Sequence, residues 1–291
     1  MKLDILWRGP LMSCNYGCDY CPFGKRVDGT AELEVDRAQL ERFVGWVESR
    51  VGDTLGVLFT PWGEALTRRW YRDAIVRLSH LPQIRRVAAQ TNLSTPPGWL
   101  RDAAVDKVAL WCTYHPEWTE RPRFLSHVAE LRARGVSASI GVVGFRRFFA
   151  EIESLRADLP ADTYMWVNAV KDGSQSPYSE AELSRLLAID RLARDNTVEH
   201  PSLGQACRSG ADVVSIDGDG VIRRCHFVKA PIGHLYEAGI EAALAQSLCR
   251  ACPNDHCGCH IGYVHLDRLG LRQVYGDGIL ERIPTQISRT S

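Results

Sequence analysis

Three cysteines near the start of the chain have a spacing that suits a metal cluster. Cys14, Cys18 and Cys21 fall within the eight residues CNYGCDYC. Three thiolates do not complete a structural zinc site, which closes with four ligands. They can bind three irons of a 4Fe-4S cubane and leave the fourth iron open to a substrate or cofactor. The alternative is zinc, or a purely structural cluster, whose fourth ligand comes from a distant part of the chain.

Six further cysteines are gathered near the other end, and their spacing includes one CxxC and one CxC pair. In a reducing compartment, clustered thiolates bind metal or do redox chemistry more often than they form disulfides. A zinc ribbon and an iron-sulfur site both fit this pattern. Cys112 lies in an apolar run and is expected to be a small buried side chain. The six are Cys207, Cys225, Cys249, Cys252, Cys257 and Cys259.

Composition excludes some partners. The 291 residues carry 35 Lys plus Arg and 35 Asp plus Glu, so no net charge favours nucleic acid. The opening residues, MKLDILWRG, contain too short an apolar run for a signal peptide. Nowhere do about 18 consecutive apolar residues predict a membrane span. We therefore expect a cytoplasmic protein with neither a membrane nor a nucleic-acid partner.

The elements that must position these cysteines follow an alternating pattern. Six short apolar runs of strand length are separated by helical stretches, which predicts an α/β fold with a parallel sheet, either doubly wound or curled into a barrel. The clearest helices start near Asp36, behind an Asp36–Gln39 capping pair, and at Ser179, with Glu182 three residues on. The six runs are 3–7, 55–60, 86–91, 107–114, 137–143 and 163–168.

After about Asn196 prolines, glycines and cysteines become frequent, and we predict a second, cysteine-rich α+β module. Residues 213–216 and 221–224 read as a hairpin around a DGDG turn, whose glycines allow positive φ. The stretches 22–34 and 171–178 read as loops. The predicted division is therefore 1–196 and 197–291, and the residues from His260 onward are expected to pack back on the first unit.

The cysteine trio is similar to a known signature. The spacing Cys14-x3-Cys18-x2-Cys21, with Tyr20 before the last cysteine and the whole motif after the first strand, resembles that of radical S-adenosylmethionine (SAM) enzymes. The resemblance implies a six-stranded partial TIM-like barrel over residues 3–168. It also implies a 4Fe-4S cluster whose open iron binds SAM, an external reductant such as flavodoxin or ferredoxin, and a 5′-deoxyadenosyl radical that takes hydrogen from substrate.

The resemblance extends to further positions around the cofactor. Members of the family usually carry Gly-Gly-Glu-Pro after the second strand, where this chain has Trp62-Gly63-Glu64-Ala65, so two of the four residues match. Strand 5 is where the family holds the ribose and adenine. The implied cofactor-binding residues are Tyr20, Gly63, Glu64, Asn92, Thr113, Ser139, Gly141 and Val143.

The C-terminal cysteines resemble the Twitch and SPASM modules of some radical SAM enzymes, which hold auxiliary 4Fe-4S clusters. The resemblance implies one auxiliary cluster, held by Cys207, Cys225, Cys249 and Cys252, for electron transfer or sulfur donation. Cys257 and Cys259 are left over. They could replace one of those four ligands or hold a second, incompletely ligated cluster.

Three functions remain open at this stage. The first is a radical SAM enzyme acting on a small polar metabolite, such as a sugar, cyclitol, nucleoside or amino-acid derivative, in natural-product biosynthesis. The second is a maturase of a ribosomally made peptide, and the third is a non-enzymatic electron carrier. No catalytic residue is fixed by the sequence. The candidates at the strand ends are His115, Asn168 and Arg8, with Lys171 as a further polar group.

Overall fold

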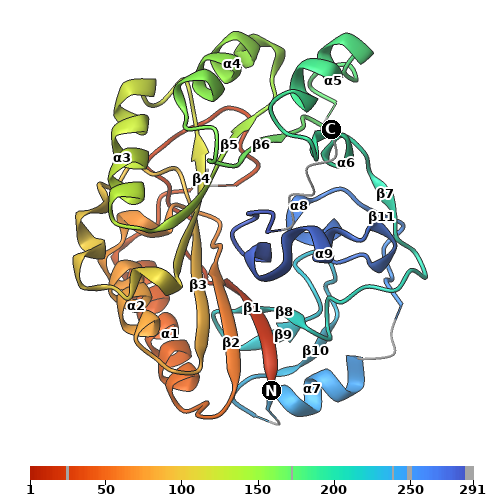
Figure 1. Cartoon of the computed structure of the whole chain (residues 1–291). Coiled ribbons are helices and arrows are strands. Elements are labelled where there is room, and N and C mark those ends of the chain that lie inside the picture. The colour runs from red at the N-terminus through yellow and green to blue at the C-terminus, as the bar shows by residue number, and fades with distance from the viewer. Residues whose placement is uncertain (24–25, 172, 238, 248–250, 286–291) are drawn as a thin grey trace.

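A single mixed sheet organises the molecule. The computed structural model describes residues 1–23, 26–171, 173–237, 239–247 and 251–285. Within these residues the largest sheet has nine strands in the order β10-β9-β8-β1-β2-β3-β4-β5-β6, so β6 and β10 are its edges and it does not close into a barrel (Figure 1). The strands are β1 (Lys2–Arg8), β2 (Thr54–Phe59), β3 (Ile84–Thr91), β4 (Val108–Tyr114), β5 (Ser137–Val143), β6 (Met165–Asn168), β8 (Val213–Asp217), β9 (Val221–Arg223) and β10 (Pro231–His234).

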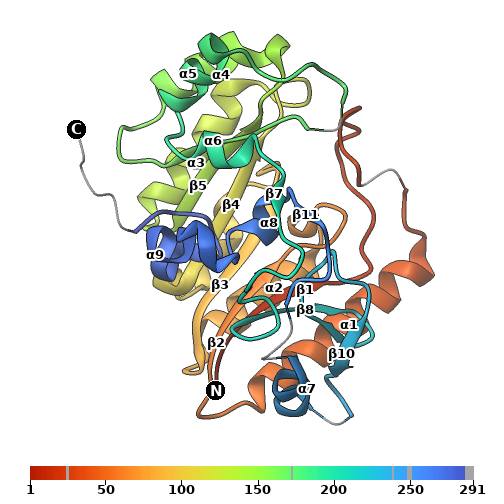
Figure 2. The same ribbon diagram turned by 90° about the vertical axis from the view of Figure 1, so that its right-hand side faces the viewer.

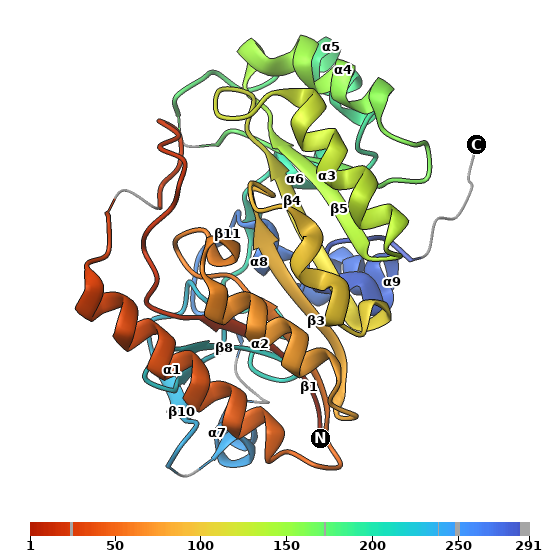
Figure 3. The same cartoon turned by 90° about the vertical axis from the view of Figure 1, so that its left-hand side faces the viewer.

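Strands β1 to β6 pair in parallel, as the alternating pattern predicts. Parallel strands carry crossover connections, and four helices cover the outer face of the sheet (Figure 3). The expected α/β partial barrel is therefore confirmed. Within the described residues, none of the helices is long and apolar enough to cross a membrane. The four are α1 (Thr30–Glu48), α2 (Arg69–Ser79), α3 (Arg121–Ala133) and α4 (Phe149–Asp158).

Two details of the helices differ from the prediction. The first helix begins at Thr30, six residues before Asp36, because Glu32 returns its side chain to the Gly29 backbone N–H. Residues 30–34 are thus helical rather than loop. The β3–β4 connection has two 3-10 turns, Pro97–Asp102 and Val105–Lys107, in place of an α-helix. Prolines 96 and 97 stand at the N-cap and first position of the first turn, where proline is tolerated, and Gly98 directly after them is a poor helix former.

One hydrophobic layer lies on each side of the sheet. The outer layer, between the sheet and the helices, holds most of the buried aliphatic side chains, including Cys112, which is buried as expected. The inner layer is small and rich in tryptophan. Its members are Leu6, Leu58, Ala88, Ala109, Trp111, Trp166, Val213, Ile261 and Leu280. Because Ile261 and Leu280 come from the C-terminal region, that region does pack back on the sheet.

The C-terminal region continues the barrel's own sheet. Strand β8 pairs in parallel with β1, and β8 and β9 form the predicted hairpin, with Gly220 at a φ of +95°. The sheet thus runs through the boundary predicted at residue 196. Figures 1 and 2 show α8 and α9 on the face of the sheet opposite α1 to α4. The remaining elements are α5 (Glu180–Leu187), α6 (Ala193–Asn196), β7 (His200–Pro201), α7 (Ile240–Ser247), β11 (His256–Cys257), α8 (His260–Tyr263) and α9 (Leu271–Tyr275).

Candidate active site

The loop after β1 brings three thiols into one small space. Cys18 is buried, Cys14 and Cys21 are half-buried, and none of them is in a disulfide. Burial raises the pKa of the Cys14 thiol to about 11, and Glu64, Cys21 and Cys18 lie near enough to raise it further. Each thiolate in such a group disfavours ionisation of the others. All three are therefore deprotonated together only when a cation is bound among them.

Backbone groups of the loop point at the sulfurs. The N–H of Tyr16 donates to Cys14 Sγ and that of Phe23 donates to Cys21 Sγ, both at 3.4 Å. Such N–H donors stabilise cluster thiolates and tune their potential. Among the residues described, no His, Cys, Asp and Glu side chains converge in threes on one point as a single ion would require. Ligands of a cubane bind separate irons and need not converge, so this donor set fits a 4Fe-4S cluster.

Two buried carboxylates hold the chain just before Cys14. Asp28 Oδ2 accepts from the backbone N–H groups of Met12 and Ser13, at 2.8 and 2.7 Å, and from the Ser13 hydroxyl. Asp36 Oδ1 accepts from the N–H of Leu11. These hydrogen bonds fix the backbone of residues 11–13, and that backbone positions the cysteine loop that follows it. Asp28 was not predicted as an anchor, and Asp36 was predicted at a helix cap; an acidic residue at the apolar spacing of α1 was the available signal.

The segment after β2 makes hydrogen bonds to the backbone of the same residues, 11–13. Gly63 N–H donates to the carbonyl of Leu11, and Glu64 N–H donates to that of Ser13, at 2.9 and 3.0 Å. A Cβ on Gly63 would lie 2.0 Å from the carbonyl oxygen of Ser13, so only glycine allows this approach. Gly63 is thus required for backbone pairing next to the cysteines.

The Glu64 side chain is fully engaged by the protein. Its carboxylate accepts from Leu66 N–H at 3.0 Å, from the Thr91 hydroxyl at 2.8 Å and from Asn92 N–H at 2.7 Å. Burial raises the pKa of this carboxyl, and the three hydrogen bonds oppose the rise. Glu64 therefore joins the ends of β2 and β3. Asn92, which it positions, donates from Nδ2 to Asn15 Oδ1 at 2.9 Å, with Cys14 Sγ 3.9 Å away.

His115, one of the catalytic candidates, lies directly against the trio. Its Nδ1 is 2.8 Å from the Tyr20 hydroxyl and 3.4 Å from Cys18 Sγ. Burial lowers the pKa of His115 to about 4, so the imidazole is neutral near pH 7. Thr113, two residues earlier on β4, is half-buried. The structure thus brings His115 and Tyr20 together at Cys18.

Two of the three strand 5 positions, Ser139 and Gly141, contact other parts of the protein. Ser139 is buried, and its hydroxyl donates to the Glu281 carbonyl at 2.6 Å. A Cβ on Gly141 would lie 1.9 Å from the Trp166 ring, so glycine here makes room for that indole. Val143 is half-buried at the end of the strand. Ser139 therefore contacts the C-terminal segment and Gly141 contacts Trp166, while the role of strand 5 in holding a nucleoside stays a prediction.

Polar side chains line the carboxyl ends of the strands around the loop. Arg8 Nη1 donates to the Thr60 carbonyl at 2.9 Å, and its guanidinium lies 4.0 Å from the centre of the Trp62 ring. Asn168 is exposed at the end of β6. Lys171 Nζ donates to the Asn196 carbonyl at 2.7 Å. Gln90, which the sequence analysis did not identify, bonds Thr60 Oγ1 at this level.

Four C-terminal cysteines come together from separate segments. Burial raises the pKa of Cys225 to about 11 and that of Cys257 to about 12, and each is near enough to Cys207 and Cys252 for these to raise it further. A hydrogen bond from Cys252 N–H to the Gln205 carbonyl brings Cys252 beside the Cys207 segment. Cys249, which the sequence places in the ligand set, lies outside the described residues. Cys257, one of the two leftover cysteines, is part of the group.

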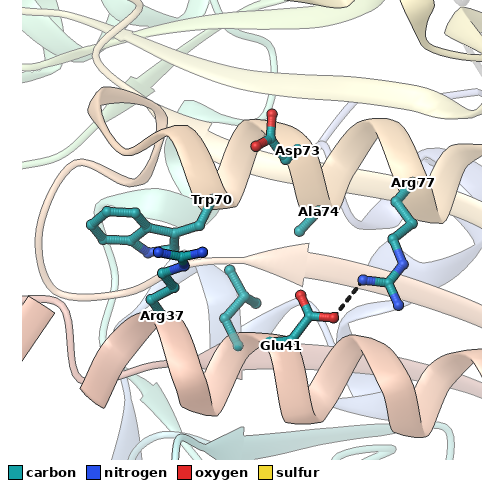
Figure 4. A pocket seen from close by; sticks show the side chains of 7 residues that line it. Arg37, Glu41, Trp70, Asp73, Ala74 and Arg77 are labelled. Carbon is teal, nitrogen blue, oxygen red and sulfur yellow. Dashed lines mark hydrogen bonds and ion pairs between the residues drawn. The ribbon is translucent and has the colours of Figure 1, made fainter. Parts of the chain in front are cut away.

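A groove on the outer surface does not belong to this site. It lies between α1 and α2, on the helical side of the sheet, and Figure 4 shows the side chains that line it. Its Arg77 pairs with Glu41 at 2.6 Å and also with Glu48. The charge of Arg77 is thus compensated, and no predicted site residue lines the groove.

Comparisons with solved structures agree with the observed fold. No family model matches the sequence, and no curated protein matches it. The chain is similar to native anSMEcpe with bound AdoMet, at a TM-score of 0.56 and 12% identity, covering 83% of this chain and 80% of that one. A histidine-tagged form of anSMEcpe with bound AdoMet gives 0.55 and 13%, covering 83% and 79%. At this identity the likeness shows a shared fold and nothing more.

Proposed function

We propose that the protein is a radical SAM enzyme. One observation carries the proposal: three thiols with N–H donors on two of their sulfurs lie in the loop after β1, at the carboxyl ends of parallel strands. Barrel enzymes place their chemistry at that end. The similar fold of anSMEcpe, solved with AdoMet bound, supports the same interpretation.

The chain's own residues have distinct parts in this proposal. Cys14, Cys18 and Cys21 would hold the 4Fe-4S cluster, which supplies an electron for reductive cleavage of SAM. Asp28, Asp36 and Gly63 position the loop through the backbone of residues 11–13. Glu64 holds the Asn92 backbone, and the Asn92 amide next to Cys14 can donate to a polar group of a bound cofactor.

The C-terminal cysteines support an auxiliary cluster within the same proposal. Its ligands would be Cys207, Cys225, Cys252 and Cys257, because the first three come from separate segments and lie near Cys257; Cys259 also lies near Cys257 and stays outside the proposed set. Four thiolates leave no open iron, and a fully ligated cluster suits electron transfer better than sulfur donation. In this set Cys257 takes the place of Cys249 as a ligand, which is one of the alternatives that the spacing left open.

The test is the conversion of SAM to 5′-deoxyadenosine. Anaerobically reconstituted protein with dithionite should form it without added substrate, and Cys18→Ala should not. Iron without SAM binding or cleavage would favour an electron carrier instead. Zinc at the trio would remove the basis of the proposal.

For the substrate we propose a small polar metabolite, because Arg8, Gln90, Thr113 and Asn168 give the strand ends a polar lining. A peptide maturase is the second candidate. It is favoured by a specific observation: anSMEcpe was also solved with AdoMet and the Cp18Cys peptide, at a TM-score of 0.53 and 13% identity to this chain. Co-expression with any short peptide encoded beside the gene, followed by mass spectrometry, separates the two: a modified peptide would establish the maturase.

A further inference from the structure

Two buried nitrogen atoms near the end of β1 lack a partner. Arg8 Nε and His226 Nε2 are inaccessible to solvent and make no hydrogen bond within the described part of the chain. Ser215 Oγ lies 2.6 Å from His226 Nδ1 and fixes the ring. When the serine hydroxyl donates to Nδ1, Nε2 carries the proton and is a donor. Buried donors without acceptors are rare in folded proteins and usually indicate an ordered water or a ligand.

The charge of Arg8 also lacks a counter-ion. No carboxylate lies within ion-pair distance of its guanidinium among the described residues, where it contacts the Thr60 carbonyl and the Trp62 ring. Burial lowers the pKa of Arg8 to about 10, and Cys259 is the titratable group close enough to oppose this. The Arg8 side chain is half-buried and its Nε is inaccessible to solvent, and a partly desolvated cation without a carboxylate partner points to an anion that arrives from outside.

Two further cations lie near the same thiol as Arg8. Lys171 and Arg282 are, like Arg8, near enough to Cys259 for this thiol to raise their pKa values, while burial lowers them. Arg282 is buried, and its Nε also lacks a partner within the described residues. Three cations therefore lie near one thiol; Glu199 is also near Lys171 and Glu281 near Arg282, whereas Arg8 has no carboxylate among the groups that shift its pKa.

We propose that Arg8 and His226 bind an anionic group, a carboxylate or a phosphate, of the substrate. The inference rests on the proposed function and names the chemical class of its substrate. Arg8 supplies the positive charge, and the Trp62 ring beneath its guanidinium holds that guanidinium in place. His226 supplies a second donor from the hairpin that follows β8. Trp62 stands where the family carries glycine, so this arrangement belongs to this chain.

The experiment measures binding of inorganic phosphate to the anaerobically reconstituted protein by titration calorimetry, with and without SAM. We expect phosphate to bind in both cases, and Arg8→Gln to weaken its binding at least tenfold. His226→Gln should weaken it less, and it serves as the second variant if Arg8→Gln does not fold. Arg101→Gln is the matched control, because Arg101 is exposed and pairs only with Asp102 among the residues described. It should bind phosphate as the wild type does.

Three results would overturn the inference. They are no phosphate binding by the wild type, unchanged binding in both variants, and displacement of phosphate by SAM, which would assign the donors to the carboxylate of the cofactor. Formation of 5′-deoxyadenosine is followed separately in the wild type. Its absence would contradict the proposed function while leaving the phosphate measurement interpretable, so the two failures are distinguishable.

Discussion

The two groups of cysteines are built in different ways. Cys14, Cys18 and Cys21 belong to one loop, and their arrangement is set by neighbours in sequence and by the backbone of residues 11–13. The C-terminal group is assembled from segments around residues 207, 225, 252 and 257, which meet only because β8 joins β1 and β11 joins β7. A site within one loop can therefore be predicted from the spacing of its cysteines, whereas a site assembled from separate segments depends on the whole fold.

The largest effect is expected at the local site. Cys18→Ala should reduce 5′-deoxyadenosine formation to the level of a protein-free control, because two thiolates cannot hold the cluster with one open iron. The measurement is chromatographic quantification of 5′-deoxyadenosine after anaerobic reconstitution. Cys112→Ala is the matched control: Cys112 is fully buried in the helix-facing layer, and its removal should leave cleavage in place.

The assembled site should lose metal without losing SAM cleavage. Wild-type protein with two 4Fe-4S clusters would hold about eight irons per chain, and Cys257→Ser should reduce this to about four. Iron analysis and electron paramagnetic resonance provide the measurement. If Cys249→Ser removed iron and Cys257→Ser did not, the ligand set would be the one that the spacing predicts.

A steric change tests how firmly the local site is held. Gly63→Ala places a methyl group against the Ser13 carbonyl, which belongs to the backbone and cannot move aside as a side chain would. We expect a loss of about 1–3 kcal/mol in the free energy of unfolding, together with reduced iron content. Urea denaturation measures the first. Normal stability with a full iron complement would show that the loop does not depend on this contact.

The smallest expected change is stabilising and serves as the counterpart of Gly63→Ala. Gly45 lies exposed within α1, and a Cβ there would meet nothing within 4 Å. Gly45→Ala should raise the free energy of unfolding by about 0.5–1 kcal/mol, because alanine loses less backbone entropy in a helix. Iron content should stay unchanged. A destabilised variant would mean that the glycine has a role beyond the helix.

Much of the fold follows from the sequence. The six strands of the barrel, the hairpin at 213–224 and the Ser179–Glu182 capping box were all predicted, because each depends on apolar period or on side chains within a few residues. The start of α1 was predicted wrongly at Asp36. That aspartate follows the apolar spacing of the helix and turns inward to Trp70 Nε1 and the Tyr71 hydroxyl, contacts that no local pattern contains.

The sequence by itself determined the cysteine trio, the parallel sheet and the strand ends that surround it, since spacing and periodicity are properties of a continuous segment. Only the tertiary structure decided that Cys257 lies near Cys207, Cys225 and Cys252, that Ser139 meets the Glu281 carbonyl and that Arg8 has no carboxylate partner among the described residues. Each of these depends on groups separated by many residues, and their meeting is set by how the sheet and the C-terminal segment pack together.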